Sequence, residues 1–202
     1  DNFITQSLLA LHDESKPYKT KVHVYKSDVE TVLNSIQKIA KIETLYSMQE
    51  TGLTNTYKRD KSVKKWCRAH NVSWKEHINN GVSRGLQNRS RWRQTWTDYM
   101  LKPIKPFRAE ATNFVTIDIL EEVQLEPKKQ AGIQVGGTKT GLAYLDSFLN
   151  KRHKKYQQSI SKPEASRIHC GRVSPYIAWG NLSVRYVWQR AKQAKAAGAN
   201  GF

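Results

Sequence analysis

Apolar side chains recur at helical spacing in several stretches of the first half of the chain. Residues 3–11 place them on one helical face, and Pro17 ends that element. Ser27 or Asp28 is predicted to cap a second helix, and a third helix is predicted over residues 55–70. The apolar positions of the second helix are Val29, Val32, Leu33, Ile36, Ile39 and Ala40.

Short runs with the period of a β-strand lie between these helices. Residues 21–25 alternate apolar and polar side chains, and residues 43–48 and 72–78 also read as strands. Short strands separated by helices are typical of βαβ units in a parallel sheet that helices cover on both faces. We therefore predict an α/β fold with part of a parallel, Rossmann-like sheet.

The pattern changes in the second half of the chain. Residues 107–135 contain no long helical pattern and many acidic side chains, which indicates an extended interdomain linker. After Gly136 and Gly137, apolar positions at helical spacing predict a second domain made of helices. The predicted parts are an α/β domain over 1–106, the linker, and a helical domain over 136–202.

Basic residues outnumber acidic ones two to one and are unevenly distributed. The chain has 34 Lys and Arg against 17 Asp and Glu, a formal net charge of +17. The stretch 128–202 holds only Asp146 and Glu164 as acids and has a net charge of +12. Such a surface attracts a nucleic acid, a phosphorylated cofactor or an anionic membrane, and a simple solvated basic face is an equal alternative.

Several classes of protein are excluded by composition. Hydrophobic residues make up 38% and aromatic residues 10%, too many for a wholly disordered chain. No apolar run approaches the roughly 20 residues that span a bilayer. Cys67 and Cys170 are too few for a disulfide framework, so we expect a reducing, cytoplasmic environment. Because the chain starts at Asp1 without a leader, we expect an internal piece of a longer protein.

Familiar catalytic and metal motifs are missing. The stretch Gly132–Thr140 resembles a P-loop, but Thr138 separates Lys139 from the second glycine, so a loop opening a helix is the better interpretation. The histidines do not pair at metal-binding spacing, and we predict no metal site. His169 and Cys170 are adjacent in sequence, which is poor geometry for a nucleophile and its base.

A segment rich in arginine and tryptophan allows two interpretations. It contains Arg84, Arg89, Arg91, Trp92, Arg93 and Trp96. Alternating cations and aromatic rings can neutralise phosphates and stack on bases. Alternatively, both tryptophans face the core of the protein from one side of a helix while the arginines line its outer side, and we favour this second interpretation.

The turn before Ser174 has the composition of a phosphate-binding loop. Gly171 allows the backbone to come close to a ligand, and Arg172 supplies positive charge. Ser174 and Pro175 are suited to start a helix, whose first N–H groups bind anions.

The sequence around this turn resembles a known family. Cys170-Gly-Arg-Val-Ser-Pro-Tyr-Ile-Ala-Trp-Gly-Asn-Leu-Ser183 is similar to the pattern Thr-Ser-x-Leu-Ser-Pro-Tyr-Leu-x-x-Gly-x-(Ile/Leu)-Ser of the photolyase/cryptochrome family. The match also takes in Gly136, Gly137, Leu145, Phe148, Leu149 and Tyr156. The resemblance implies the end of an α/β antenna domain, a linker and the start of an all-helical FAD-binding domain.

The resemblance also implies binding residues for cofactors. Tyr156 and the stretch of Cys170, Gly171, Arg172, Val173 and Ser174 would hold the phosphates of FAD. Cys170 and Gly171 replace the hydroxyl residues of the family pattern. Tyr46-Ser-Met-Gln-Glu50 resembles the end of an antenna strand, where members with a folate chromophore present a glutamate, so Glu50 is a candidate for a folate or other antenna chromophore.

The function implied for the parent protein is light-driven repair of pyrimidine dimers in DNA by a monomeric, FAD-dependent lyase. We expect this fragment alone to be inactive, and its catalytic residues are unknown because the tryptophan relay of the family would lie outside residues 1–202. One alternative is a cryptochrome, a blue-light photoreceptor of the same fold without repair activity. Another is a nucleic-acid-binding module without cofactor that uses the arginine and tryptophan segment.

Overall fold

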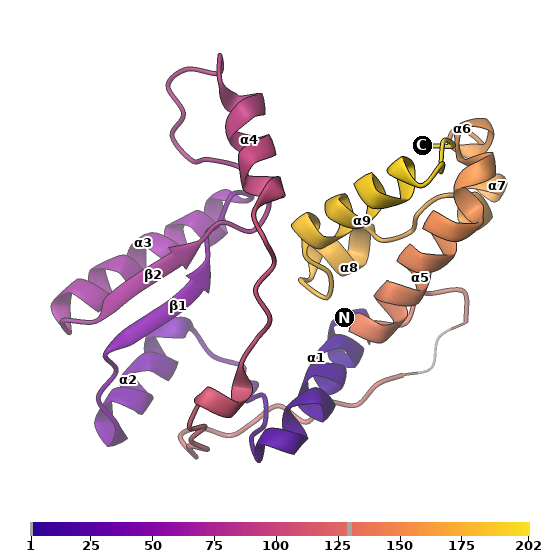
Figure 1. The fold of residues 1–202 in the computed structure, drawn as a ribbon. Helices are drawn as coiled ribbons and strands as arrows, with labels where there is room; N and C mark the ends of the chain where they lie inside the picture. The colour runs from indigo at the N-terminus through magenta and orange to yellow at the C-terminus, as the bar shows by residue number, and fades with distance from the viewer. Residues whose placement is uncertain (1, 129–130) are drawn as a thin grey trace. The chain divides into compact units, whose positions relative to one another are not determined.

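Two compact units make up the structure, a computed structural model that describes residues 2–128 and 131–202 (Figure 1). The sheet unit consists of His23–Thr97 and Thr112–Gln124. The helical unit consists of the described residues of Asp1–Val22, Asp98–Ala111 and Leu125–Phe202. Each unit is described separately below.

A parallel pair of strands forms the centre of the sheet unit. In β1 (Thr44–Met48) and β2 (Ser73–His77), Thr44 lies opposite Ser73 and Met48 opposite His77. The crossover between them is α3 (Thr54–Ala69), which runs beside the strands in Figure 1. This arrangement confirms the predicted βαβ unit, with a parallel sheet of two strands among the described residues.

The core of the sheet unit joins α3 to the preceding helix, α2 (Val29–Ile39). Its buried side chains are Leu33, Val63, Trp66, Cys67 and Val72. The indole N–H of Trp66 donates to Asn34 Oδ1 at 2.7 Å, so the polar atom of this buried ring is satisfied. Burial raises the pKa of the Cys67 thiol, which keeps this cysteine in its neutral form.

Asp28 is the N-cap of α2, one of the two caps that the sequence predicts. Its carboxylate accepts from the hydroxyl of Thr31 at 2.7 Å and from the backbone N–H of Thr31 at 2.9 Å. These two bonds, the hydroxyl first, hold the pKa of Asp28 below its ordinary value. The folded chain therefore releases this proton at lower pH than the unfolded chain does.

We expect the contribution of this cap to stability to be complete above about pH 4 and to be lost as the pH falls through the lowered pKa of Asp28. Asp28→Asn keeps a cap oxygen but removes the titration. The fall in unfolding temperature between about pH 5 and pH 2.5 should therefore be smaller in the variant than in the original chain. An identical fall in both proteins would contradict the assignment.

Residues 21–25, predicted as a strand, form no strand in the structure. Tyr25 makes one isolated antiparallel bridge with Glu122, and the N–H of Val123 donates to the carbonyl of Val24 at 2.8 Å. His23 Nδ1 lies 2.7 Å from Glu122 Oε1. The prediction is wrong because residues 21–25 lie beside an irregular segment around Glu122 and not beside another strand. Part of the predicted linker, Thr112–Gln124, therefore belongs to the sheet unit.

The two tryptophans of the arginine-rich segment behave differently. Both belong to α4 (Trp92–Leu101), whose residues divide between the two units. Trp96 is half-buried, and its indole N–H donates to the carbonyl of Asn80 at 3.3 Å. The Trp92 side chain is instead 52% exposed. The favoured interpretation, with both rings in the core, is therefore wrong for Trp92, which stands in the first turn of α4 where no element covers it.

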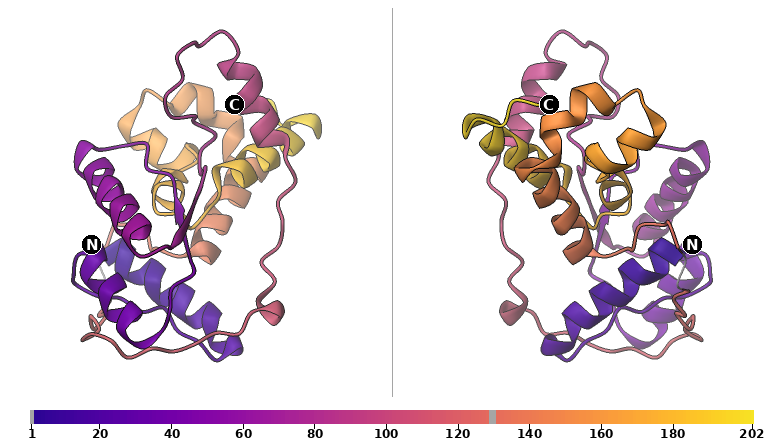
Figure 2. Two further views of the ribbon diagram at one scale, coloured as in Figure 1. Left: turned by 90° about the vertical axis from the view of Figure 1, so that its left-hand side faces the viewer. Right: turned by 90° about the vertical axis from the view of Figure 1, so that its right-hand side faces the viewer.

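Short helices form most of the helical unit (Figure 2). They are α1 (Asn2–Ser15), α5 (Thr138–Asn150), α6 (Tyr156–Ser159), α7 (Pro163–His169), α8 (Ser174–Ala178) and α9 (Val184–Ala196), with single 3₁₀ turns at Lys16–Tyr18, Ala109–Ala111 and Arg152–Lys155. The core cluster is Leu145, Phe148 and Leu149 of α5, against which Tyr186, Val187 and Ala191 of α9 pack.

The first helix makes its contacts in the helical unit, although we assigned it to the α/β part. Phe3 meets the ring of Tyr176 edge-on, with 5.1 Å between ring centroids. Gln6 Oε1 accepts from the N–H of Gly136 at 2.9 Å, and Ser7 Oγ accepts from Asn181 at 3.1 Å. These contacts join segments more than a hundred positions apart in sequence, which no local pattern reveals.

Candidate cofactor site

The turn Cys170–Ser174 connects α7 to α8 and has an unusual backbone. Arg172 adopts the left-handed conformation, with a φ of 57°, and Val173 follows in the right-handed region with φ −93° and ψ −8°. Successive residues of opposite hand turn their N–H groups toward one side and form a nest, a concavity that binds anions. Among the described residues, no acceptor is assigned to the N–H groups of Arg172, Val173 and Ser174.

Arg152 stabilises this turn through hydrogen bonds to its backbone carbonyls. Its guanidinium donates to the carbonyls of Gly171 at 3.2 Å and Tyr144 at 2.6 Å, and to the carbonyl of Cys170. A further bond to the carbonyl of Ile168 at 3.3 Å satisfies the end of α7. Arg152 thus occupies these carbonyls, and the N–H of Cys170 already donates to the carbonyl of Ser166 at 3.1 Å, whereas the N–H of Gly171 has no assigned acceptor among the described residues.

Two cations therefore stand at the turn. Burial lowers the pKa of the Arg152 guanidinium, and the neighbouring positive charge of Arg172 lowers it further, against an opposing effect of Tyr144. An arginine remains charged despite such shifts. The turn thus combines converging backbone donors with a positive local field, which is the combination that a phosphate group requires.

Arg172 is anchored to the segment before α5. Its guanidinium donates to Gln134 Oε1 at 3.1 Å, and Gln134 Nε2 donates back to the carbonyl of Arg172 at 2.8 Å. The hydroxyl of Tyr176, whose side chain is fully buried, donates to the carbonyl of Val135 at 2.7 Å. Burial raises the pKa of this phenol, which stays protonated as the donor. Gln134 and Tyr176 thereby fix the turn against the entry to α5.

Six of the predicted site residues belong to the helical unit, and two of them, Tyr156 and Val173, pack against its core cluster. Tyr156 packs edge-on against Phe148, with 5.6 Å between ring centroids, and Val173 packs against the same cluster. Ser174 is exposed at the start of α8. Gly171 has no left-handed φ, and a Cβ there would meet its nearest neighbour at 3.8 Å, an ordinary contact. The protein itself therefore does not require glycine at position 171.

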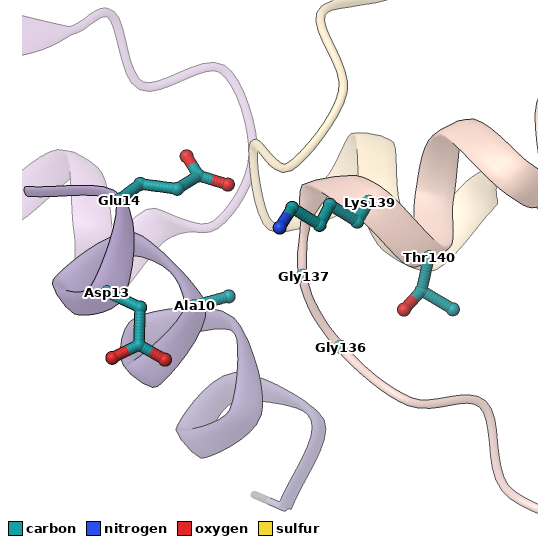
Figure 3. Close-up of a pocket in the computed structure, with 7 residues that line it drawn as sticks. All are labelled: Ala10, Asp13, Glu14, Gly136, Gly137, Lys139 and Thr140. Atoms are coloured by element: carbon teal, nitrogen blue, oxygen red, sulfur yellow. The ribbon is translucent and has the colours of Figure 1, made fainter.

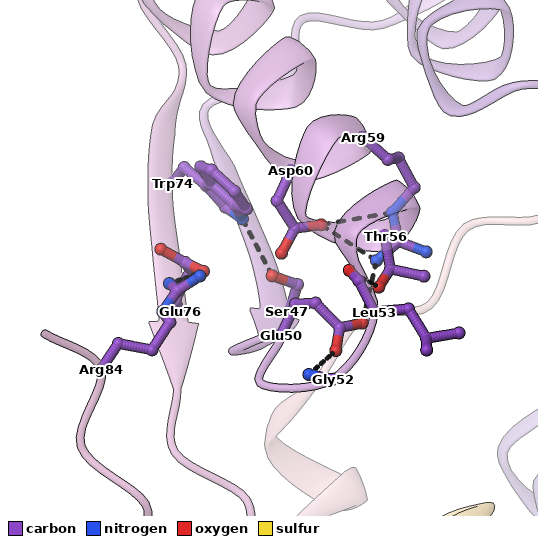
Figure 4. A network of polar contacts seen from close by, with 10 residues as sticks. All are labelled: Ser47, Glu50, Gly52, Leu53, Thr56, Arg59, Asp60, Trp74, Glu76 and Arg84. Carbon is purple, nitrogen blue, oxygen red and sulfur yellow. Dashed lines mark hydrogen bonds and ion pairs between the residues drawn. The ribbon is translucent and has the colours of Figure 1, made fainter.

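Glu50, the remaining predicted residue, lies in the sheet unit, just beyond the carboxyl end of β1 (Figure 4). It lines a pocket of about 280 Å³ together with Tyr57 and Arg84. The N–H of Gly52 donates to Glu50 Oε1 at 2.5 Å, and Arg59 lies 3.9 Å from Oε2. The bond from Gly52, followed by one from Thr56, holds the pKa of Glu50 below its ordinary value.

A buried carboxylate, that of Asp60, lies on α3 outside the lining of this pocket. Asp60 Oδ1 accepts from Arg59 at 2.9 Å, whereas Asp60 Oδ2 is buried without a hydrogen-bond partner in the part of the chain that the structure describes. Arg84 pairs with Glu76 at 2.6 Å on the neighbouring strand. Ligands of parallel sheets bind outside the carboxyl ends of the strands, which is where Glu50 lies.

A different pocket, of about 350 Å³, lies between α1 and the entry to α5 (Figure 3). Gly137 precedes the first residue of α5 with a φ of 108°, which confirms the prediction that the glycine pair opens a helix. Asp13 and Glu14 line the pocket, and none of the predicted cofactor residues does. Asp13 pairs with Lys16 at 2.6 Å, and this bond lowers the pKa of Asp13.

Solved structures with the same fold are known. A bacterial class III photolyase from Agrobacterium tumefaciens matches 96% of this chain with a TM-score of 0.70 at 16% sequence identity. An archaeal photolyase from Sulfolobus tokodaii, whose structure contains two FAD molecules, matches 95% of it with a TM-score of 0.65 at 18% identity.

The chain has the photolyase fold. This finding confirms the resemblance and the fold class predicted from the sequence. The match covers 44% of the bacterial photolyase and 43% of the archaeal one, so the chain spans less than half the length of either protein. No family model matches the sequence, and no curated protein matches it.

This photolyase-fold chain lacks two further features among its described residues. None of its described helices is long and apolar enough to cross a membrane. Within residues 2–128 and 131–202, no group of three His, Cys, Asp or Glu side chains is arranged to hold a metal ion.

Sequence reasoning missed the residues that support the turn. Arg152 stands in the basic run Lys151-Arg-His-Lys-Lys155, which looks like solvated surface charge. Gln134 carries no local signal at all. Only Tyr176 could have been found, because it belongs to the Ser-Pro-Tyr part of the motif that matches the photolyase pattern.

Proposed function

We propose that this chain is part of a photolyase-like flavoprotein and that the turn Cys170–Ser174 binds the phosphates of FAD. The observation that carries this proposal is the nest at Arg172 and Val173, with N–H groups that have no assigned acceptor among the described residues. The photolyase fold of the chain supports it.

The residues present fit a diphosphate. The N–H groups of the nest and the exposed Ser174 hydroxyl are neutral donors, and Arg172 supplies a charged one. Tyr156 and Val173, both packed on the core cluster, would set the position of the turn. Bound FAD would supply the light-driven electron transfer, while the protein supplies binding and electrostatics.

The activity that we propose for the whole protein is repair of pyrimidine dimers in DNA under blue light, with the dimer flipped out of the duplex as in photolyases generally. The acid-poor surface of residues 128–202, with its net charge of +12, suits both FAD and DNA as anionic partners. We further propose a monomeric protein of the cytoplasm.

The pocket of Glu50 is the corresponding proposal for an antenna chromophore, such as a folate. Its position beyond the carboxyl end of β1 and the polar side chains of Glu50 and Arg84 in its lining support a polar ligand there. Titration of the purified protein with a folate, monitored by chromophore fluorescence, tests this proposal, and Glu50→Ala should abolish the response.

The test of the main proposal uses the complete natural protein that contains this chain, purified in the dark. It should carry flavin absorbance and repair a dimer-containing oligonucleotide under blue light. Flavin photoreduction without repair would favour the cryptochrome-type photoreceptor. A colourless protein that does not take up added FAD would overturn both.

Arg172→Ala should weaken FAD retention by about 1.5–3 kcal/mol, the contribution of a charged hydrogen bond. Alanine keeps the same backbone strain at this left-handed position, and the change removes both the charge and the bond of Arg172 to Gln134 Oε1. Flavin occupancy after dialysis measures the effect, and Arg167→Ala, an exposed arginine of α7, is the matched control. Equal occupancy in the two variants would count against the assignment.

A further inference from the structure

An exposed tryptophan surrounded by arginines stands at the start of α4. The Trp92 side chain is 52% exposed, and Arg89, Arg91 and Arg93 beside it are exposed as well. The sequence contains no acidic residue between Glu76 and Asp98. None of these arginines lies within ion-pair distance of a described carboxylate, so the three charges are not neutralised by the residues that the structure describes.

The backbone that carries Trp92 is held in place without help from its ring. Asn88 Oδ1 accepts from the N–H of Ser90 at 2.7 Å, and the N–H of Trp92 donates to the carbonyl of Arg89 at 3.2 Å. Trp96, one turn further along α4, is bonded to Asn80. A large apolar ring that the fold does not bury, on an ordered helix start, is available to a partner.

We propose that Trp92, Arg89, Arg91 and Arg93 form a binding site for single-stranded nucleic acid. The face of an indole ring stacks on any unpaired base, and flanking arginines bind the phosphates on either side. In a duplex the base faces are already stacked, so the ring would find few partners there. The site therefore distinguishes single strands from duplexes by stacking and not by charge.

Membrane binding explains this surface less well. A helix that lies in a membrane interface inserts a row of apolar side chains. On α4, Trp96 is half-buried and Met100 is fully buried, and the exposed Leu101 lies at the opposite end of the helix from Trp92, so these residues do not form a row of exposed apolar side chains. The immediate sequence neighbours of Trp92 are the exposed Arg91 and Arg93, which suits a stack on one base with phosphates bound on either side.

This site goes beyond the proposed flavin function and does not rest on it. It uses no residue of the turn Cys170–Ser174, and its arginines and Trp92 belong to the sheet unit. The two proposals fail separately, because loss of strand binding leaves flavin uptake untouched and a colourless protein leaves strand binding intact.

The experiment measures the anisotropy of a fluorescein-labelled oligothymidylate and of a duplex of equal length, titrated with the 202-residue chain at several KCl concentrations. The chain should bind the single strand more tightly than the duplex. Trp92→Ala should weaken binding of the single strand by roughly tenfold, and Trp92→Phe should retain most of the affinity. Replacing the three arginines with glutamine should reduce the slope of log affinity against log salt by about 2.

The matched control removes the same number of exposed cations elsewhere in the sheet unit, in Lys26→Gln, Lys38→Gln and Lys41→Gln combined. If this control weakens binding as much as the arginine variant does, the positive charge of the whole surface attracts the strand, and the proposal of a specific site is wrong. Equal affinity for strand and duplex, unchanged binding by Trp92→Ala, or Trp92-dependent binding to anionic vesicles in place of the strand would also overturn it. Circular dichroism should show every variant folded, and the comparison of the arginine variant with the lysine control, which leaves Trp92 in place, keeps the proposal testable if the alanine variant does not fold.

Discussion

Arg152→Ala is expected to destabilise the helical unit by about 3 kcal/mol, a large effect for a residue in a basic surface run. The guanidinium donates to carbonyls from the middle of α5, the end of α7 and the turn before α8, at Tyr144, Ile168 and Gly171. Removal leaves the part-buried oxygens of Tyr144 and Gly171 and the exposed oxygen of Ile168 without their charged donor. Urea denaturation followed by circular dichroism measures the loss.

Arg152→Lys and Arg167→Ala are the controls for this prediction. Lysine keeps the charge but cannot reach several carbonyls at once from a single ammonium, so it should restore only part of the lost stability. Arg167 is an exposed arginine of α7 and should be replaceable at nearly no cost. If Arg152→Ala proves as stable as Arg167→Ala, Arg152 does not support the turn.

The elements that the sequence predicts well are those whose apolar side chains face one core. The strands at 43–48 and 72–78 and the helix at 55–70 agree with the structure to within one or two residues at either end, because Val63, Trp66, Cys67 and Val72 repeat toward the same cluster. Their order also fixes the parallel pairing, since a helical crossover returns the second strand in the same direction.

The elements that the sequence predicts poorly depend on partners that a local pattern does not specify. Residues 21–25 have the alternation of a strand, but a strand needs a neighbour, and only Tyr25 finds a bridge. Trp92 and Trp96 are four positions apart, yet one is anchored to Asn80 and the other is exposed. The periodicity of the sequence predicts the helix, but it does not show which residues of that helix other parts of the protein bury.

The candidate site divides in the same way. The turn Cys170–Ser174 is recognisable from sequence because its residues are consecutive and match a family pattern. The residues that support this turn cannot be recognised from the sequence, because Arg152 and Gln134 contact it from 18 and 38 positions away in the chain. The left-handed backbone of Arg172 is similarly hidden, since arginine gives no sign of the conformation that glycine or asparagine would suggest.

Gly136→Ala is expected to have a comparable effect on stability, again about 3 kcal/mol, by separating α1 from the entry to α5. A Cβ at this position would meet the carbonyl oxygen of Phe3, and it would lie 2.5 Å from Ser7 Oγ. Because the first of these is backbone, a rotation of one side chain does not relieve the clash, and α1 itself has to move. The bonds from Gly136 to Gln6 and from Asn181 to Ser7 would be lost with it.

Hydrogen–deuterium exchange separates this outcome from general unfolding. In Gly136→Ala, the amides of α1 should exchange faster while those of α3, in the sheet unit, keep their protection. Gly171→Ala is the matched control, because a Cβ at that glycine makes only ordinary contacts, and its α1 amides should exchange as in the original chain. Unchanged exchange in α1 of the Gly136 variant would show that this helix is not held by the close approach of Gly136, and its contacts from Phe3 to Tyr176 and from Asn181 to Ser7 would then have to hold it.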